Sequence, residues 1–264
     1  MQIPLFHVDA FIDRAGSGNP AAICLLNSWL DDESLRKVAA ENNLSATAFL
    51  VEKRGLYQLR WFTPLREIEL CGHATLASAY ILFSILQPGL ETQRFQTRFS
   101  GELTVRKDED GLSMDFPALF AKRREQASSG LIAALGLQKP PLELWEVNDI
   151  LVAVLGTSGE IRDIRPDFAL LEQLHPYAVT VTAPGEDSDF VSRYFAPSYG
   201  VPEDPVTGSA HCALAPYWAK RMSKPHLRAR QLSDRGGELW CEIAGSRVVL
   251  KGKAVLVLKG TLSI

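Results

Sequence analysis

The chain has 264 residues, of which 46% are hydrophobic and 22% are charged, and this composition is ordinary for a soluble globular protein. Its length allows one large or two modest domains. The formal net charge of −3, without a basic run or zinc-finger spacing, argues against nucleic acid or an anionic membrane as the main partner.

The cysteines and the N-terminus bear on location. The four cysteines are far apart and form no Cys-x-x-Cys pair, so we expect no metal site, and a reduced cytoplasmic protein is the simplest interpretation. The first residues, Met-Gln-Ile-Pro-Leu-Phe, lack the cationic stretch and apolar core of a signal peptide. The most apolar segment, residues 74–86, is shorter than the ~20 residues that a membrane span needs.

The first half of the chain is predicted to be mainly β with one long apolar helix. In order, we expect strands at 3–12 and 20–26, a helix at 31–42, a hairpin at 47–52 and 56–62, a helix at about 73–86, and two or three strands within 94–116. The helix at 73–86 carries few charges on any side, which is typical of a helix enclosed by sheet.

The second half repeats this order. We expect strands within 144–155, a short helix near 167–174, strands at 177–182 and 190–196, a central helix at about 208–221, and four closing strands. The charged residues 122–125 mark a linker between residues 117 and 126. We therefore predict an α+β protein with halves at 1–118 and 119–264, each a curved sheet around a central helix, and the last strand is free to return to the first half.

Two segments read like copies of one another. Residues 61–64 are Trp-Phe-Thr-Pro and residues 70–77 are Leu-Cys-Gly-His-Ala-Thr-Leu-Ala; residues 194–197 are Tyr-Phe-Ala-Pro and residues 206–213 are Val-Thr-Gly-Ser-Ala-His-Cys-Ala. Each is an aromatic strand that ends in proline, then a short loop, a glycine and an apolar helix. Helix N-termini favour anions, so two such starts facing one cleft predict a site for a small carboxylate.

The duplicated segments supply the first candidate site residues. Gly72 allows close backbone approach to a ligand, and His73 could donate to a bound acid or exchange a proton with it. In the second copy, Asp204 precedes the turn and Ser209 can cap the helix. The plain alternatives are a glycine turn with a capping histidine and a solvated acidic turn, but the match between the copies favours function for both.

Two other interpretations are weaker. A two-cysteine racemase would need a thiol at the place corresponding to Cys71, which holds Thr207, and Cys212 lies further into its helix. Residues 16–20, Gly-Ser-Gly-Asn-Pro, lack the third glycine of a dinucleotide fingerprint and are interpreted as a turn that presents Asn19.

The chain resembles the phenazine-biosynthesis PhzF-like isomerases over nearly its whole length. The matching motifs are Phe-His-Val-Asp-Ala-Phe at residues 6–11, Gly-Asn-Pro-Ala-Ala at 18–22, Phe-Thr-Pro at 62–64, Cys-Gly-His-Ala-Thr at 71–75 and Asp-Pro-Val-Thr-Gly-Ser-Ala at 204–210. The resemblance implies a diaminopimelate-epimerase-like fold, an active site between two pseudo-symmetric halves, and a homodimer that needs no metal or cofactor.

The resemblance also implies an activity and a set of site residues. The best-understood family activity isomerises dihydro-3-hydroxyanthranilate by moving a proton between ring carbons. The substrate of this chain is expected to be a small carboxylic acid, with His73 and Asp204 beside the reacting atoms. The expected substrate-binding residues are Asn19, Ser45, Gly72, Ala74, Gly208 and Ser209.

One position departs from the family pattern. The family carries the proton on a glutamate in a Ser-Glu-Thr-x-Phe motif, and residues 45–49 here read Ser-Ala-Thr-Ala-Phe, so Ala46 stands at the catalytic position. Alanine has no proton to exchange, and a positioned general acid-base contributes about 10²–10⁴-fold. We therefore expect isomerisation to be nearly abolished while the binding pocket remains.

Three explanations for Ala46 stay open at this point. The chain is an engineered variant, a natural member that lost the chemistry, or a member in which His73 or Asp204 took over the proton; Glu41 is expected to lie too far away. A different class of function, a non-catalytic small-molecule-binding or interaction protein on the same scaffold, is the main alternative.

Overall fold

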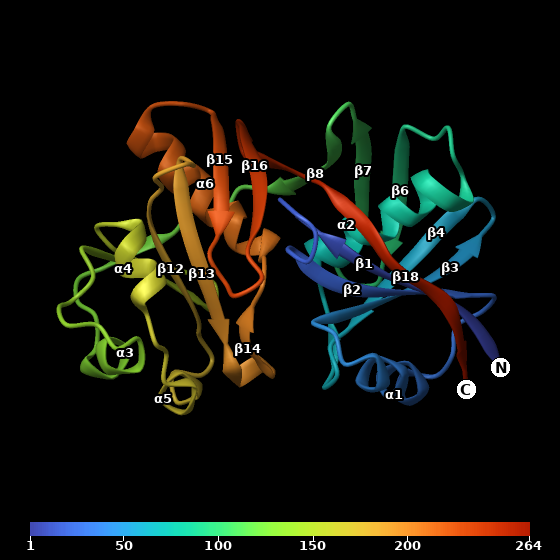
Figure 1. Cartoon of the computed structure of the whole chain (residues 1–264), viewed down its shortest axis with the longest axis horizontal. Helices are drawn as coiled ribbons and strands as arrows, with labels where there is room; N and C mark the ends of the chain where they lie inside the picture. Colours follow the sequence, from blue (N-terminus) through green and yellow to red (C-terminus); the bar gives the residue numbers. More distant parts are fainter. The chain divides into compact units, whose positions relative to one another are not determined.

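A computed structural model describes all residues, 1–264, and divides them into two compact units. Unit 1 comprises Met1–Asp115 and Lys251–Ile264, and unit 2 comprises Phe116–Leu250 (Figure 1). The chain therefore leaves unit 1 after Asp115 and returns to it at Lys251. The last strand, β18 (Ala254–Ser263), pairs antiparallel with the first strand, β1 (Gln2–Ala10).

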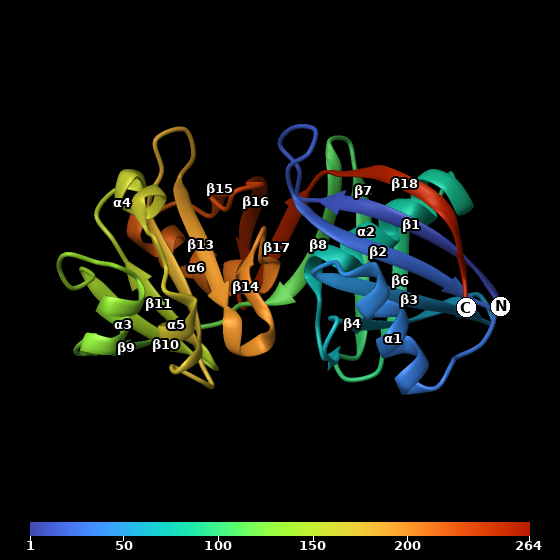
Figure 2. The ribbon, with the colours of Figure 1, turned by 60° about the horizontal axis from the view of Figure 1, so that its bottom comes forward.

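Unit 1 is mainly β. Its remaining elements are β2 (Asn19–Leu26), α1 (Asp32–Asn42), β3 (Ala46–Lys53), β4 (Leu56–Phe62), β5 (Glu67–Ile68), α2 (Gly72–Ile81), β6 (Thr92–Thr97), β7 (Glu102–Asp108) and β8 (Gly111–Pro117), whose end lies in unit 2. The pairing runs β18–β1–β2–β3–β4–β6–β7–β8, with short β5 also on β4; the β2–β3 and β4–β6 pairs are parallel and the others antiparallel. The strands curve around α2 (Figure 2).

The central helix α2 is enclosed because its residues are small or apolar. Every residue of α2 except Gly72 and Tyr80 is buried, and the helix packs against β1, β2, β3, β7 and β18. The sequence predicts one helix to residue 86, but α-helical geometry ends at Ile81. Leu82–Leu86 form a π-helical turn instead.

The other face of the sheet is covered by α1. The Asp31 side chain accepts a hydrogen bond from the Ser34 backbone N–H at 2.9 Å and caps this helix. Leu35 and Val38 of α1 pack in one buried cluster with Phe49 of β3. Side chains alternate along a strand, so Ala46 and Ala48 point to the opposite face, which α2 covers.

Unit 2 is also mixed α and β. Its elements are β9 (Lys122–Arg124), α3 (Ser129–Ala134), β10 (Glu143–Val147), β11 (Ile150–Val154), α4 (Ser158–Asp163), α5 (Phe168–Glu172), β12 (Ala178–Pro184), β13 (Phe190–Ala196), β14 (Val201–Asp204), α6 (Gly208–Met222), β15 (His226–Gln231), β16 (Gly237–Ala244) and β17 (Arg247–Gly252), whose end lies in unit 1.

The strand pairings of unit 2 repeat those of unit 1. The β10–β11 pair is antiparallel, β11–β12 parallel, β12–β13 antiparallel and β13–β15 parallel, with short β14 antiparallel on β13. The same sequence of pairings joins β1, β2, β3, β4, β6 and β5. Trp61 pairs with Ala48, and Tyr194 pairs with Thr180. Since Trp61 corresponds to Tyr194, Ala46 corresponds to Ala178, the first residue of β12.

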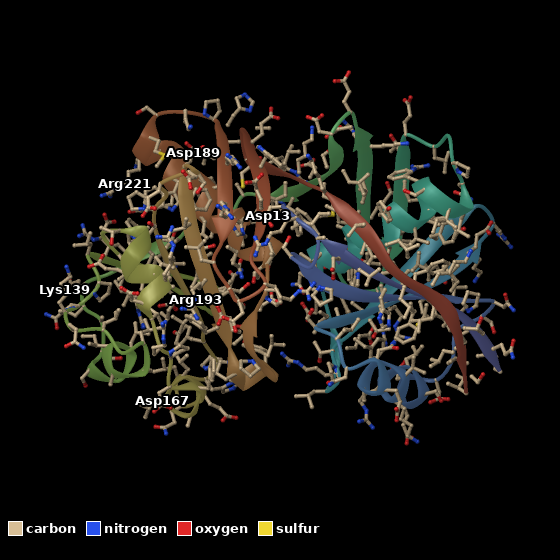
Figure 3. All side chains as sticks on the ribbon, in the orientation of Figure 1. Asp13, Lys139, Asp167, Asp189, Arg193 and Arg221 are labelled. Atoms are coloured by element: carbon tan, nitrogen blue, oxygen red, sulfur yellow. The ribbon has the colours of Figure 1, made fainter.

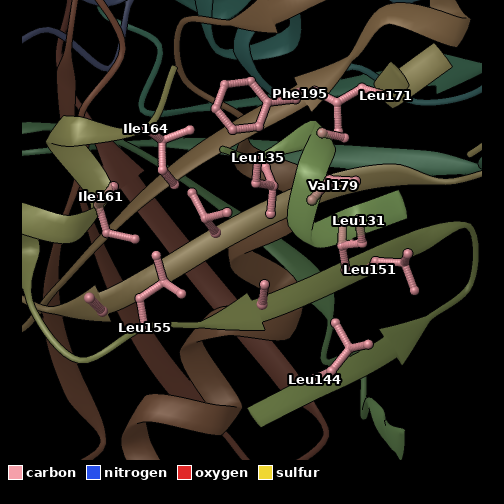
Figure 4. Close-up of a cluster of buried hydrophobic side chains, with 14 of the residues drawn as sticks. Leu131, Leu135, Leu144, Leu151, Leu155, Ile161, Ile164, Leu171, Val179 and Phe195 are labelled. Atoms are coloured by element: carbon pink, nitrogen blue, oxygen red, sulfur yellow. The ribbon is translucent and has the colours of Figure 1, made fainter. Parts of the chain in front are cut away.

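The peripheral helices of unit 2 bury a leucine-rich cluster against its sheet. Leu131 of α3, Ile161 of α4 and Leu171 of α5 meet Val179 and Phe195 of the strands (Figure 4). The sequence analysis predicts α5 but not α3 or α4, each of which has six residues. Residues 122–124, predicted to lie in a linker, instead form β9 on β10.

The cluster gives a test of the unit 2 core. Leu131 is 1% exposed, whereas Leu142 is 58% exposed. We expect Leu131→Ala to lower the free energy of unfolding by about 2–5 kcal/mol, because it leaves a cavity. Leu142→Ala, the control, should change it by less than ~0.5 kcal/mol. Urea unfolding measures both, and equal losses would contradict this packing.

Candidate active site

The first group of candidate residues surrounds the start of α2. The N-cap residue Cys71 has extended backbone geometry and makes no side-chain capping bond, and the first turn carries no acidic residue. Thr75 donates its hydroxyl to the Cys71 carbonyl at 2.6 Å and stabilises the turn from inside. The N–H groups of Gly72, His73 and Ala74 have no intrahelical acceptor, so this helix start is suited to an anion.

His73 is a neutral side chain in this turn. It is 7% exposed, and burial lowers its pKa to about 3. The Cys71 Sγ lies 3.5 Å from His73 Nδ1. A neutral imidazole can donate one hydrogen bond to a bound acid, but it brings no positive charge, and a pKa near 3 makes it a weak base at neutral pH.

Asn19, Ser45 and Ala46 come together where β2 and β3 begin. The Ser45 hydroxyl lies 2.5 Å from Asn19 Oδ1 and 2.9 Å from the Pro20 carbonyl oxygen. Ala46 is fully buried and pairs with Ala21 of β2. The start of β3 pairs with the end of β4, from which β5 leads to α2, so Ala46 lies at the end of unit 1 where α2 begins.

The second group surrounds the start of α6. Its N-cap is Thr207, not the predicted Ser209; Thr207 has extended geometry and makes no side-chain cap, and the first turn again lacks an acidic residue. Gly208 is buried, and Ser209 is exposed at the second helical position. This helix start has the same backbone form as that of α2.

Asp204 is tied to the α6 turn by hydrogen bonds. The Thr207 hydroxyl donates to Asp204 Oδ2 at 2.5 Å. Gln231, at the end of β15, accepts from the Thr207 backbone N–H at 2.9 Å and donates to the Asp204 carbonyl at 2.6 Å. Sequence reasoning missed Gln231, because it lies 24 residues beyond Thr207 and in no motif. The turn is therefore held from a neighbouring strand.

Both helix starts have a hydrogen bond from a side chain to the N-cap carbonyl, although different residue types make it. His211 occupies the position of Thr75, and its Nδ1 lies 2.8 Å from the Thr207 carbonyl, the counterpart of the bond from Thr75 to Cys71. The carbonyl accepts, so Nδ1 carries the hydrogen. Nε2 of His211 is buried without a hydrogen-bond partner. Thr75 and His211 thus stabilise their helix starts through the same kind of hydrogen bond.

The cysteine arrangement disfavours two-thiol chemistry. Thr207 stands at the N-cap position that Cys71 holds in unit 1, and Cys212 lies inside α6. Burial raises the pKa of Cys212 to about 12, so it stays a thiol.

No group of three or more His, Cys, Asp or Glu side chains is arranged to hold a metal ion. None of the helices combines the length and the apolar character that crossing a membrane requires.

Comparisons with known proteins agree with the motifs. A family model described as phenazine biosynthesis-like protein matches residues 8–260. An uncharacterized isomerase of Pseudomonas aeruginosa is 51% identical, and a phenazine biosynthesis-like domain-containing protein of Homo sapiens is 38% identical; both alignments cover 100% of each chain.

Solved structures extend the likeness to the fold. The crystal structure of a PhzF-family phenazine biosynthesis protein from Enterococcus faecalis matches with a TM-score of 0.94 at 43% identity, over 100% of both chains. A hydroxyproline epimerase from Agrobacterium vitis matches with a TM-score of 0.60 at 10% identity, over 99% of this chain and 92% of that one. The second match concerns the fold alone, and it confirms the predicted epimerase-like fold class.

The buried histidine of α6 predicts a pH dependence. Burial lowers the pKa of His211 to about 4, and the bond to the Thr207 carbonyl raises it in part. Between pH 6.5 and about 4, His211 is protonated in the unfolded chain and neutral in the folded chain. The free energy of unfolding therefore falls as pH falls, by about 1.4 kcal/mol per pH unit for this group.

We expect His211→Gln to reduce the slope of the unfolding free energy against pH, below pH 6.5, by about 1.4 kcal/mol per pH unit. Urea unfolding between pH 4.5 and 7 measures the slope, with His226→Gln, at an exposed histidine, as the control. An unchanged slope for His211→Gln would show that the folded chain protonates this imidazole.

Proposed function

The chain belongs to the phenazine biosynthesis-like (PhzF-like) isomerase family, and we propose that it binds a small carboxylic acid at the starts of α2 and α6 while Ala46 impairs proton transfer. One observation carries the proposal. Both helix starts lack a side-chain cap and an acidic residue in the first turn, and the position of the family's proton carrier holds a buried methyl group.

The binding half of the proposal rests on backbone donors. The N–H groups of Gly72 and Ala74, and those of Gly208 and Ser209, supply hydrogen bonds and a positive dipole end to a carboxylate. Neutral His73 adds one donor. Asp204 orients a hydroxyl or amine of the same ligand. Asn19 and Ser45 shape the pocket beside position 46.

The chemical half concerns the missing carboxylate. In the family reaction a glutamate carboxylate takes a proton from one ring carbon, and its carboxylic acid form returns the proton to another. Ala46 can do neither. Its counterpart in unit 2 is Ala178, which is 1% exposed, so neither unit offers a carboxylate at this position.

The remaining bases do not replace it well. The pKa of His73, lowered to about 3 by burial, leaves too weak a base to abstract a carbon-bound proton near neutral pH. Asp204 already accepts the Thr207 hydroxyl. These facts support an impaired isomerase over transfer of the role to another residue. The second candidate, a binding protein without catalysis, is favoured by the same uncapped helix starts.

Restoring a carboxylate tests the proposal. We expect Ala46→Glu to raise deuterium uptake from heavy water into dihydro-3-hydroxyanthranilate by at least about 10²-fold, because it restores a positioned general base. NMR follows the uptake. Ala178→Glu, which buries a carboxylate at the corresponding place of unit 2, is the matched control and should stay at the starting rate.

The alternatives give different results. Equal uptake by the chain as written and by Ala46→Glu would mean that another base carries the proton. No uptake by either, together with binding of the same acid, would favour the non-catalytic candidate.

We also propose a cytoplasmic homodimer. All four cysteines are free, which supports a reducing compartment. β18 is paired with β1 alone, and its residues 257–261 are exposed on both faces. Val257 is 61% and Leu258 is 46% exposed. A long apolar edge strand of this kind is suited to pairing with another strand.

The sequence of β18 supports a second copy as the partner. Two copies can pair antiparallel about a two-fold axis, and the residue on the axis then faces itself. Leu258 on the axis sets Val257 opposite Lys259 and Leu256 opposite Gly260. Lys259 on the axis would set two like charges face to face.

Leu258→Lys should therefore shift the protein from dimer toward monomer in sedimentation experiments. The reason is that a charge at the axis meets its own copy. Phe99→Lys, at a ring that is 55% exposed elsewhere in unit 1, is the control and should leave the dimer intact. A dimer that tolerates Leu258→Lys would place the interface elsewhere.

A further inference from the structure

In each unit a largely buried arginine lies between a glutamate and an aromatic ring, outside the residues discussed so far. In unit 1, Arg60 of β4 donates from Nε to Glu67 Oε1 at 2.6 Å and from Nη2 to Glu67 Oε2 at 2.6 Å. Its guanidinium carbon lies 5.1 Å from the centre of the Phe62 ring. The two charged side chains are 10% and 15% exposed. This is a largely buried, two-bond ion pair.

Unit 2 repeats the arrangement. Arg193 of β13 donates from Nε to Glu203 Oε1 at 2.7 Å and from Nη2 to Glu203 Oε2 at 2.9 Å, and it lies 5.0 Å from the Phe195 ring centre. These charged side chains are 9% and 17% exposed. Arg193 lies inward from Lys139 and Asp167, which are at the margin of the unit (Figure 3).

The two ion pairs occupy corresponding positions. In each unit the arginine precedes the phenylalanine by two residues, and the glutamate is the cross-strand partner of that phenylalanine. In each unit the glutamate also precedes the first glycine of the central helix by five residues: Glu67 before Gly72, and Glu203 before Gly208. The ion pair therefore fixes the short strand from which the ligand-binding turn starts.

Each arginine makes a third connection, to the helical crossover of its unit. Arg60 donates from Nη2 to Asp32 Oδ1 at 2.8 Å, at the start of α1. Arg193 donates from Nη1 to the Ile164 carbonyl at 2.9 Å and to the Ile161 carbonyl at 3.2 Å, at the end of α4. In unit 1 that crossover leads to Ser45 and Ala46. One guanidinium thus joins the segment before position 46 to the turn before α2.

We propose that Arg60 and Arg193 are positioning residues, which hold the turns before α2 and α6 in the geometry that receives the ligand. The ligand in this proposal rests on the proposed function. That each arginine holds its turn in place does not depend on that function. Arginine suits the role because its planar fork makes two parallel bonds to a carboxylate and stacks on a ring; lysine has a single charged point and can do neither.

The experiment compares Arg60→Lys and Arg193→Lys with two controls. Arg98→Lys alters an arginine that bonds to the same Glu67, at 2.9 Å, but is 48% exposed. Arg228→Lys alters an equally exposed arginine paired with Glu238 on the β15–β16 hairpin. Amide hydrogen exchange and melting temperature are measured without ligand. Deuterium uptake into dihydro-3-hydroxyanthranilate is then measured in the Ala46→Glu background.

We expect Arg60→Lys to speed amide exchange at residues 68–75 and Arg193→Lys to speed it at residues 204–211, each leaving the other unit unchanged. Each should lower kcat/KM by about tenfold or more, because small misplacement of bound groups is costly. A positioning role predicts that KM rises or kcat falls while the melting temperature stays near that of the controls.

The outcomes separate the two proposals. Unchanged amide exchange at the turns, or changes no larger than those of Arg98→Lys and Arg228→Lys, would overturn the positioning role. Faster exchange together with a lower melting temperature, but with unaltered kcat and KM, would also overturn the positioning role. The ion pairs would then contribute to stability alone. Faster local exchange with no uptake in any variant would support the positioning role and count against the proposed substrate chemistry.

Discussion

The first N–H groups of a buried helix lack partners within the helix, and most helices satisfy one of them with the side chain of the N-cap. Neither central helix of this chain does so. Cys71 and Thr207 stand at the N-caps without a side-chain cap, and Gly72 and Gly208 follow them. Both helix starts are left without a side-chain cap, and each turn is stabilised by other contacts, from Thr75, His211 and Gln231.

The same backbone carries different chemistry in the two units. Unit 1 presents a thiol and a neutral imidazole beside its helix start, whereas unit 2 presents a hydroxyl and a carboxylate. In the paired strands Asp204 is opposite Tyr194, and its counterpart opposite Trp61 is Ile68. The two helix starts therefore share a backbone form but differ in the polar groups beside them.

The sequence reveals the parts of this arrangement that are local. The repeated motifs at residues 61–77 and 194–213 predicted both strands and both helix starts, and the comparisons confirm the family that the motifs indicated. Contacts between distant residues stayed hidden. Arg193 and Glu203 are ten residues apart on different strands, and Gln231 reaches the α6 turn from β15. The short helices α3 and α4 were not predicted, whereas the similarly short α5 was.

A carboxylate at position 46 could exchange a proton but would lower the stability of the fold. Ala46 is fully buried on the face that α2 covers, and burial of a carboxyl group raises its pKa toward the range in which it can both accept and return a proton. The same burial costs folding free energy, because a charge or an unpaired acid is removed from water. Alanine avoids this loss of folding free energy and offers no group that exchanges a proton. The hydrogen bonds that stabilise both helix starts come from Thr75, His211 and Gln231 and do not involve the side chain of residue 46.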